Sequence, residues 1–293
     1  MGSLFFVLAA AAGPAVVEVP GGTIDVMIEA QPSGLTRAQV LAWVEGSARA
    51  VAAYYGSFPV PRVRLRIHSG WRGRVGGGRT QGGPDGASID ISLGSATAES
   101  DLDGDWELVH EMVHLAFPSM RHRQAWIEEG LATYVEPIAR ARAGCGKGED
   151  IWRWLTWGLP QGSSAVEHSG LDTARGRAAT YWGGALFCFL ADVEIRKETD
   201  NRKSLDDALR AIVKAGGNVN VEWDLSRVLA VGDKAVGAAV LTKLRARMGE
   251  QPMTVDVKAI LKSLGVSGDR SGVTFDDTAP LSAIRRGIQT GAL

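Results

Sequence analysis

Two histidines and a glutamate in the run His-Glu-Met-Val-His, residues 110–114, constrain this chain more than any other feature. Residues four apart lie on one face of an α-helix, so His110 and His114 can bind one metal ion together. Glu111 lies beside them, where a carboxylate can accept a proton from a metal-bound water. The spacing therefore predicts a helix that carries a Zn²⁺ site and a general base.

The residues around this run favour a buried helix. Acidic residues precede it, where they stabilise the positive end of a helix dipole, and Pro118 ends it. Most of its other faces are apolar, through Trp106, Leu108, Val109, Met112, Val113, Leu115 and Ala116. Enclosed polar groups are costly unless they bind a metal or one another. The alternative is that both histidines are structural groups of a core helix.

A second run, Trp-Ile-Glu-Glu-Gly-Leu-Ala at residues 126–132, offers a third ligand. Glu129 and Glu128 are both carboxylates, but one residue along a helix turns by about 100°, so they cannot face the metal equally. The sequence favours Glu129, with Glu128 as the alternative. Thr133, one turn after Glu129, is a candidate to support the metal ligands.

These runs resemble those of the gluzincin zinc metallopeptidases, whose aminopeptidase branches carry a motif of the form Trp-x-x-Glu-Gly-x-Ala. The resemblance implies that His110, His114 and Glu129 bind one Zn²⁺ and that Glu111 is the catalytic base. It covers roughly residues 63–215 and is closest to the glycyl-aminopeptidase-like and M1-like branches.

A third match to this family is the pattern Tyr-x-x-Gly, formed here by Tyr181 and Gly184. In the aminopeptidase branches this tyrosine donates a hydrogen bond to the oxyanion of the tetrahedral intermediate. The resemblance gives Tyr181 that role, although Gly183 stands where the family usually has lysine. The alternative is a tyrosine that packs at the start of a helix.

The resemblance implies an α+β, thermolysin-like (gluzincin) catalytic fold, in which a mixed N-terminal sheet with an edge strand precedes a helical subdomain. We expect residues 16–100 to form the strand-rich half and residues 101–293 the helical half of one catalytic domain. Strict alternation predicts strands at 63–67 and 89–93. The strand at 87–93 is expected to be the edge along which an extended peptide lies.

Local signals add one helix and one loop to this picture. Thr36 and Gln39 form a capping-box pattern before a helical run at 38–55, which Gly56 ends. The glycine-rich stretch 70–86 predicts a mobile surface loop. It contains part of a P-loop pattern, Gly73, Gly78, Arg79 and Thr80, but it cannot open a helix, so nucleotide binding is not expected.

One family feature is missing. The Gly-x-Met-Glu-Asn segment, which binds the substrate's free amine in many of these aminopeptidases, is absent, and residues 82–88 stand in its expected place. A free amine would need another carboxylate, for which Glu128 and Asp85 are the candidates. The motifs favour an aminopeptidase, with an endopeptidase as the alternative.

Three further groups of residues have open roles. Trp152, Trp154 and Trp157 either line a hydrophobic subsite or pack a helix onto its neighbours. His122 and His168 are expected at the surface. Cys145 and Cys188 are too isolated for a disulfide framework or a zinc site, and Cys188 is expected to be a buried thiol.

Composition excludes some other classes of protein. The 293 residues carry a formal net charge of −1, with 45% hydrophobic and 22% charged residues, as in ordinary soluble globular proteins. There is no basic excess to indicate a nucleic-acid partner, and no apolar run of the length of a membrane span. Residues 1–15 resemble a signal peptide, which predicts a secreted or periplasmic protein. The alternative is that residues 1–15 form an apolar strand or a flexible tail of a cytoplasmic protein.

The most economical hypothesis is a zinc-dependent peptidase that hydrolyses bonds in a peptide or protein substrate. A catalytically silent gluzincin-fold protein that only binds peptides is an alternative, against which an intact Glu111 argues. A hydrolase acting on another carbonyl compound is a further alternative, because the zinc–water chemistry does not itself specify an amide.

Overall fold

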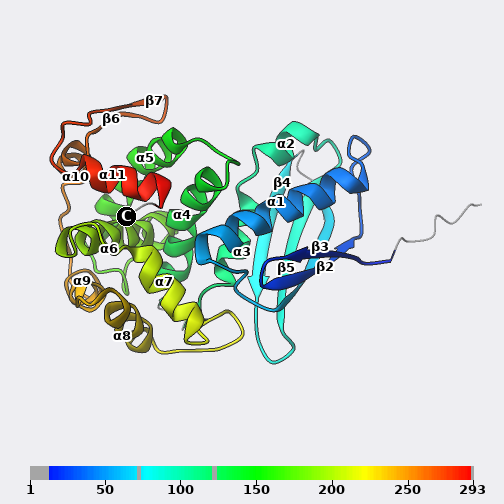
Figure 1. Ribbon diagram of the computed structural model, residues 1–293, viewed down its shortest axis with the longest axis horizontal. Coiled ribbons are helices and arrows are strands. Elements are labelled where there is room, and N and C mark those ends of the chain that lie inside the picture. The colour runs from blue at the N-terminus through cyan, green and yellow to red at the C-terminus, as the bar shows by residue number, and fades with distance from the viewer. Residues whose placement is uncertain (1–12, 71–73, 121–123, 292–293) are drawn as a thin grey trace, which may run out of the picture.

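The computed structural model describes residues 13–70, 74–120 and 124–291. Most of the predicted signal peptide, as well as His122, lies outside these ranges, so export remains a prediction. The described part forms a sheet and a helical half that lie side by side, with α3 (Glu107–His114) between them (Figure 1). The predicted order of a mixed sheet followed by a helical subdomain is confirmed.

The sheet has five strands in the order β1-β2-β3-β5-β4. Neighbours β2, β3 and β5 are parallel, whereas β1 and β4 pair antiparallel at the two ends, so the sheet is mixed. Their bounds are Ala15–Val19 (β1), Gly22–Ile28 (β2), Arg62–Gly70 (β3), Val75–Gln81 (β4) and Ala87–Gly94 (β5).

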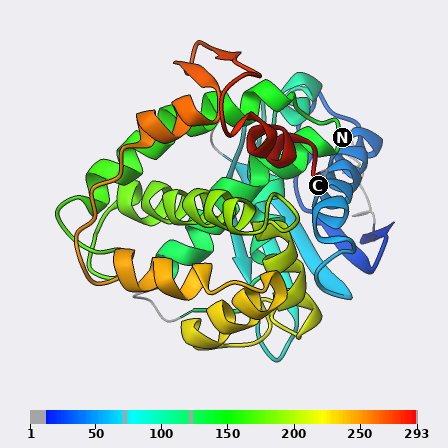
Figure 2. The same ribbon diagram turned by 60° about the vertical axis from the view of Figure 1, so that its left-hand side comes forward.

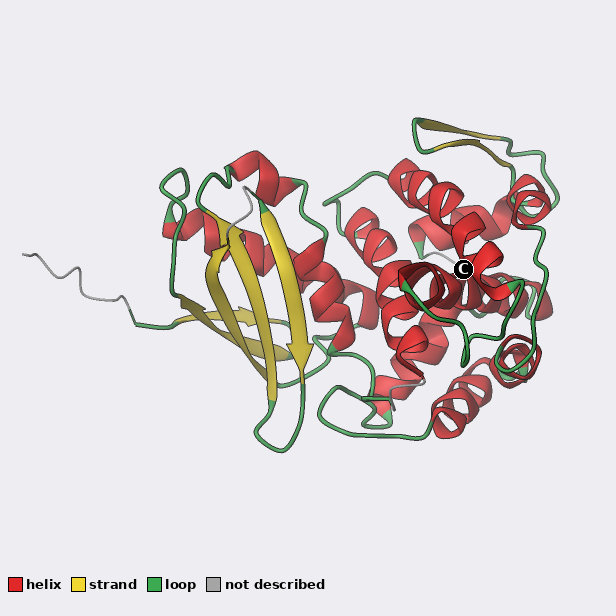
Figure 3. Ribbon diagram, turned by 180° about the vertical axis from the view of Figure 1, so that it is seen from behind, coloured by secondary structure: helices red, strands yellow, loops and turns green. Residues whose placement is uncertain are grey.

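Strand alternation determines which face of the sheet is buried. In β3 the side chains of Val63, Leu65 and Ile67 are buried, and the arginines between them are exposed. Helix α1 (Arg37–Tyr55) lies on the apolar side, and Figure 3 shows that the opposite face of the sheet carries no described helix. The predicted capping box of Thr36 begins α1, and Gly56, with a φ of 88°, ends it.

The predicted edge strand was wrong. Residues 87–94 form β5, which is flanked by β3 and β4, and the strand at the edge is β4. Residues 82–86 do form a turn, but the prediction of a loop at 70–86 was wrong for residues 75–81, which form the strand β4. Its glycines carry no side-chain alternation, and backbone bonds to β5 hold β4 in the sheet, with a register shift between Gly76 and Arg79. The described part of this stretch opens no helix, which a P-loop requires.

The helical half begins after the sheet and is organised around two buried helices, α4 (Ala125–Arg142) and α6 (Gly184–Glu198). Figure 2 shows the other helices of this half grouped around α6. The remaining elements of this half are α5 (Gly148–Val166), the π-helix η2 (Ala178–Gly183), α7 (Leu205–Lys214), α8 (Leu225–Val236), α9 (Val240–Met248), α10 (Val257–Ser263), the strands β6 (Val266–Asp269) and β7 (Gly272–Phe275), and α11 (Ser282–Thr290). The short helix α2 (Glu99–Asp103) lies beside the sheet, next to α1 (Figure 1).

A buried charge network joins the two halves. The hydroxyl of Tyr54, in α1, donates to Asp206 over 2.7 Å, and the guanidinium of Arg142, in α4, donates to the other oxygen of Asp206 over 2.5 Å. Arg142 also donates to the carbonyl of Ile288 in α11. Removing one member would leave a buried charge without its partner, so the network holds the sheet and the helices in one arrangement.

Two expectations about single residues are confirmed. Cys188 is buried and Cys145 is exposed, and both are free thiols. His168 is exposed at the surface. None of the described helices has the length and apolar character that crossing a membrane requires.

Candidate metal centre

Helix α3 starts where the acidic residues before it predict. Asp105 accepts hydrogen bonds from the backbone N–H groups of Glu107 and Leu108, at 3.0 and 3.1 Å, which satisfies two donors that a helix start leaves open. The indole of Trp43, in α1, donates to the same carboxylate at 3.1 Å. This cap fixes the direction of α3 against α1, and with it the direction of the histidine face.

The side chains of His110, His114 and Glu129 converge between α3 and α4. The Nε2 atoms of His110 and His114 lie 3.3 and 3.7 Å from the same Glu129 oxygen, and one ligand atom from each residue lies within 4.8 Å of the others. Four ligands around Zn²⁺, at bond lengths of 2.0–2.2 Å, stand about 3.3–3.6 Å apart. Both the chemistry and the spacing of these three groups therefore fit a zinc ion.

Glu129 rather than Glu128 faces the two histidines. Burial alone raises the pKa of Glu129, but the hydrogen bonds from both imidazoles outweigh it and hold the pKa well below its usual value. Glu128 points to the chain before α4, where it accepts the backbone N–H of Met120 at 3.1 Å. Its own pKa is raised to about 7, chiefly by burial. The structure thus separates the two carboxylates that sequence spacing left open.

The first histidine is enclosed on nearly all sides. His110 is 5% exposed, and burial lowers its pKa, which favours the neutral form that a metal ligand requires. Its Nδ1 atom is buried and has no hydrogen-bond partner among the described residues. Thr133 does not serve it, because that hydroxyl donates to the backbone carbonyl of Glu129 at 2.7 Å. A metal-bound histidine usually donates its second ring N–H to an acceptor, and none of the described residues supplies one to His110.

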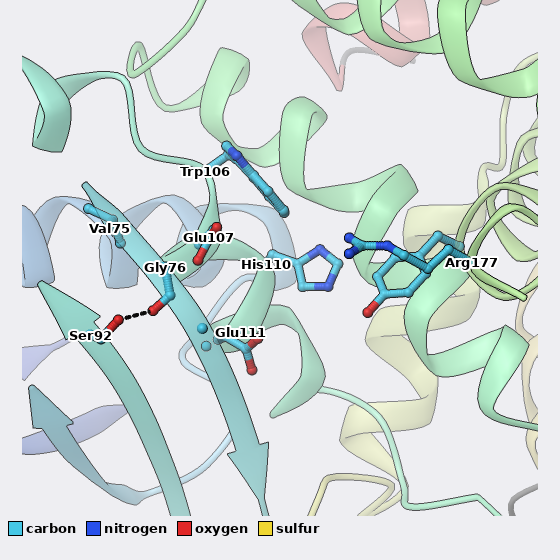
Figure 4. A pocket seen from close by; sticks show the side chains of 11 residues that line it. Val75, Gly76, Ser92, Trp106, Glu107, His110, Glu111 and Arg177 are labelled. Atoms are coloured by element: carbon cyan, nitrogen blue, oxygen red, sulfur yellow. Dashed lines mark hydrogen bonds between the residues drawn. The ribbon is translucent and has the colours of Figure 1, made fainter. Parts of the chain in front are cut away.

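Glu111 lies on the sheet side of α3, against the edge strand β4 (Figure 4). The Thr80 hydroxyl lies 2.6 Å from Glu111 Oε2 and 2.8 Å from the Glu111 backbone oxygen. Gly78 faces the side chain of Glu111, and a Cβ added to Gly78 would lie 2.5 Å from the Cγ of Glu111. Sequence reasoning missed both residues, and the only available signal was a glycine run followed by a threonine.

Tyr181 approaches the metal centre from the helical half, within η2. Its ring lies parallel to that of His110, with 6.2 Å between the centroids and 19° between the planes. Burial and the nearby charge of Glu129 raise the pKa of Tyr181 to about 12, so the phenol keeps its proton at neutral pH and can donate it in a hydrogen bond. π-Helical segments often occur at functional sites, because they turn a side chain out of the regular helical repeat.

The glycines of the two sequence motifs explain why Tyr181 and Glu129 come together. A Cβ on Gly130 would collide with the backbone of Gly184, and a Cβ on Gly184 would collide with the carbonyl oxygen of Trp126. Helices α4 and α6 therefore cross in direct backbone contact. This contact places η2, which leads directly into α6, beside the first turn of α4.

His110, Glu111 and Tyr181 border an open cleft of about 470 Å³. The backbone of residues 75–78 in β4 forms one wall, and Arg177 lies across from it, with His110 between (Figure 4). Glu107, one turn before Glu111, lines the same cleft, and its Oε2 lies 3.8 Å from a Cβ built on Gly76. Neither Glu128 nor Asp85 is among the lining residues, and Asp85 is exposed in the turn between β4 and β5.

Comparison with solved structures gives the fold a family context. An aminopeptidase N family protein from Idiomarina loihiensis superposes with a TM-score of 0.64 at 12% identity, over 86% of this chain and 49% of that one. A variant of the M1 zinc metallopeptidase from Deinococcus radiodurans superposes with a TM-score of 0.52 at 14% identity, over 84% and 53%. The chain has the fold of an M1 peptidase catalytic domain.

The M1-like fold confirms the gluzincin architecture expected from the motifs, and the His110, His114 and Glu129 group is consistent with the ligand set of that architecture. The chain spans about half the length of these solved structures. No protein-family model and no curated protein matches the sequence. The likeness is therefore one of fold, and what the site does is argued below from its geometry.

Proposed function

We propose that the protein is a zinc-dependent peptidase. One observation carries the proposal: three ligand atoms of His110, His114 and Glu129 converge on one point, and His110 and Glu111 line a cleft whose wall is an open strand edge. A structural role for the histidines does not account for this convergence on an accessible cleft.

The residues of the cleft divide the chemistry among them. Bound Zn²⁺ would lower the pKa of a water molecule from 15.7 to about 7. Glu111 accepts the proton of the attacking water and passes it to the leaving amine, while the Thr80 hydroxyl holds the carboxylate in place. Tyr181 donates a hydrogen bond to the carbonyl oxygen of the substrate, where negative charge develops during attack.

The edge strand supplies a way to hold the substrate. β4 pairs with β5 on one side only, so its other side presents backbone N–H and C=O groups to the cleft. An extended peptide can add to this edge by main-chain hydrogen bonds. A variant of the M1 zinc metallopeptidase from Deinococcus radiodurans has been solved with a Tyr-Ser-Ala substrate, and it is similar in fold at 15% identity over 83% of this chain and 54% of that one, with a TM-score of 0.50. This supports a peptide as the substrate class here.

An aminopeptidase needs an anion for the free amine of its substrate. Glu107 is the carboxylate that supports this mode, because it lines the cleft one helical turn from the base. The endopeptidase mode is supported by β4 itself, which carries no carboxylate between Val75 and Gln81. We favour the aminopeptidase, on the strength of Glu107 together with the motifs around Trp126 and Tyr181.

The test combines metal content with turnover of free peptides, amino-acid amides and N-acetylated peptides. We expect about one Zn²⁺ per chain, loss of the metal in His114→Ala, and retained metal without turnover in Glu111→Gln. His168→Ala, which changes an exposed histidine away from the cleft, is the matched control. Full zinc occupancy in His114→Ala would refute the site. Turnover by Glu111→Gln would refute the mechanism, and a zinc-loaded protein that binds peptides without cleaving any would be a silent member of the fold.

A further inference from the structure

A second cavity, of about 310 Å³, opens from the cleft toward α5. We call it the tryptophan recess. Its walls include four indoles, from Trp106 before α3, Trp154 and Trp157 in α5, and Trp182 in η2. The cleft and the recess share Trp106, His110, Arg177 and Tyr181, so a group that enters the recess lies beside the proposed reaction centre.

The indoles form a preorganised wall rather than a loose surface. The ring of Trp154 lies 5.1 Å from that of Trp157 and 4.9 Å from that of Trp182, and the rings of Trp157 and Trp182 are 5.4 Å apart. Two glycines of α5 permit this packing, because a Cβ on Gly158 would collide with the Trp182 ring and one on Gly162 with its backbone. Aromatic pairs at such distances stabilise one another beyond the apolar area that they bury.

The α5 tryptophans thus have different roles. Trp152 is fully buried and does not line the recess, so the packing interpretation holds for it. Trp154 and Trp157 are partly exposed and line it, as the subsite interpretation requires. Trp106 keeps 38% of its surface exposed at the junction of cleft and recess. An exposed indole beside a reaction site is an apolar surface that a ligand can cover.

The Glu136, Gln161 and Thr133 side chains of the recess already have partners, whereas the ring atoms His110 Nδ1 and Trp154 Nε1 are buried without one among the described residues. Glu136 is 3% exposed and accepts a hydrogen bond from Arg140 at 3.1 Å, which offsets its charge. The Gln161 amide donates to the carbonyl of Trp157 at 3.1 Å, and the Thr133 hydroxyl donates to its own helix. Arg177, on the rim, is a cation and disfavours a second one. The largest surface that the recess offers a ligand is therefore the aromatic surface of its four indoles.

We propose that the tryptophan recess binds a substrate side chain next to the scissile bond and selects large aromatic or branched aliphatic groups over small and positively charged ones. The proposal rests on the peptidase function proposed above. Full burial of a large apolar side chain in place of a methyl group favours the larger substrate by about tenfold to a hundredfold. The recess and the cleft share Tyr181 and His110, so a side chain in the recess belongs to a residue next to the cleaved bond. We therefore expect the preference at a single position of the peptide.

The first test is a panel of otherwise identical peptides, in which the residue on each side of the cleaved bond is varied in turn among alanine, leucine, phenylalanine and lysine. We expect kcat/KM at one of the two positions to rise by at least about tenfold from alanine to phenylalanine or leucine. Lysine should show no such gain. Equal rates at both positions overturn the proposal, and a preference for lysine overturns it in favour of recognition by Glu136.

Variants then assign the preference to the recess. Gln161→Phe fills the cavity and should bring the ratio of phenylalanine to alanine substrates to within about twofold of unity. Trp154→Ala should also reduce that ratio, by removing part of the wall. Trp152→Phe is the control, since it alters a buried tryptophan of the same helix that lies outside the recess. Thermal melting of each variant establishes that it is folded, and an unchanged ratio in a folded Gln161→Phe overturns the assignment.

Direct binding separates this proposal from the proposed function. The zinc-loaded Glu111→Gln protein is titrated calorimetrically with the phenylalanine and alanine peptides. At least tenfold tighter binding of the phenylalanine peptide, lost in Glu111→Gln/Gln161→Phe, supports the recess even if no peptide is cleaved. Cleavage of all peptides at equal rates, with equal affinities, overturns the recess and leaves the peptidase intact.

Discussion

Replacing Thr80 with valine keeps the shape of the side chain and removes one hydroxyl from the edge of the cleft. That hydroxyl lies 2.6 Å from the Glu111 carboxylate, and its other contact is the backbone oxygen of the same residue. A hydrogen bond to a charged group contributes about 1.5–3 kcal/mol. The carboxylate released from it keeps its charge but loses the contact that holds it against β4.

We expect Thr80→Val to lower kcat by about tenfold to a hundredfold, which corresponds to ~1.4–2.7 kcal/mol in the barrier. KM should change less, because Thr80 is not among the residues that line the cleft. Zinc content should stay near one per chain, since none of the three ligands bonds to Thr80. The assay is steady-state kinetics on the best peptide, with metal measured by mass spectrometry.

Two further variants make this prediction specific to the hydroxyl. Thr80→Ser retains a donor and should recover most of the rate. Thr199→Val removes a threonine hydroxyl that donates to the Ile195 backbone at the end of α6, away from the cleft, and should leave kcat unchanged. Wild-type kcat in Thr80→Val would refute the positioning role. An equal loss in Thr80→Ser would show that the packing of β4, rather than the hydrogen bond, is what matters.

Three other changes test the remaining parts of the site. Tyr181→Phe should lower kcat by about tenfold to a thousandfold with little change in KM, because the hydrogen bond strengthens only in the transition state. Steady-state kinetics measure this effect, and an unchanged kcat would mean that Tyr181 has only a packing role. Glu107→Gln should reduce the preference for free over N-acetylated peptides from about tenfold or more to near unity. Glu128→Gln and Asp85→Asn should keep that preference. If one of these two variants loses the preference instead, the carboxylate replaced in it, rather than Glu107, binds the free amine. Gly130→Ala should destabilise the fold by about 1–3 kcal/mol in thermal or urea unfolding, because its Cβ meets the Gly184 backbone, whereas Gly46→Ala, which meets no atom within 4 Å in α1, should be neutral or stabilising.

Local chemistry made part of this protein predictable from its sequence. The helix with His110, Glu111 and His114 follows from a four-residue spacing and from the acidic residues before it, and α1 follows from the Thr36 cap. These features depend on atoms within one or two helical turns, so the residues that determine them are adjacent in the chain. The same holds for the burial of Cys188, which lies in a continuous apolar run.

The division into a strand-rich and a helical half could be predicted from residue patterns, and the mixed character of the sheet from the family resemblance. The strand order within the sheet could not be predicted. Alternation in residues 87–94 shows that one face of that strand is buried, but it carries no information on whether one or two strands pair with it. The glycines of β4 carry no alternation at all. As a result the strand beside the metal centre was predicted to be a loop, and its neighbour was predicted to be the edge.

What only the tertiary structure decided is which side chains share the cleft. Glu128 and Glu129 are neighbours in sequence, and the crossing of α4 and α6 at Gly130 and Gly184 determines that Glu129 faces the histidines. Thr80 reaches Glu111 across 31 residues of chain, and Trp154 reaches Trp182 across 28. Such contacts depend on the packing of whole elements, whose energy is spread over many residues. A helix's own periodicity determines its faces, but the elements packed against it determine what each face meets.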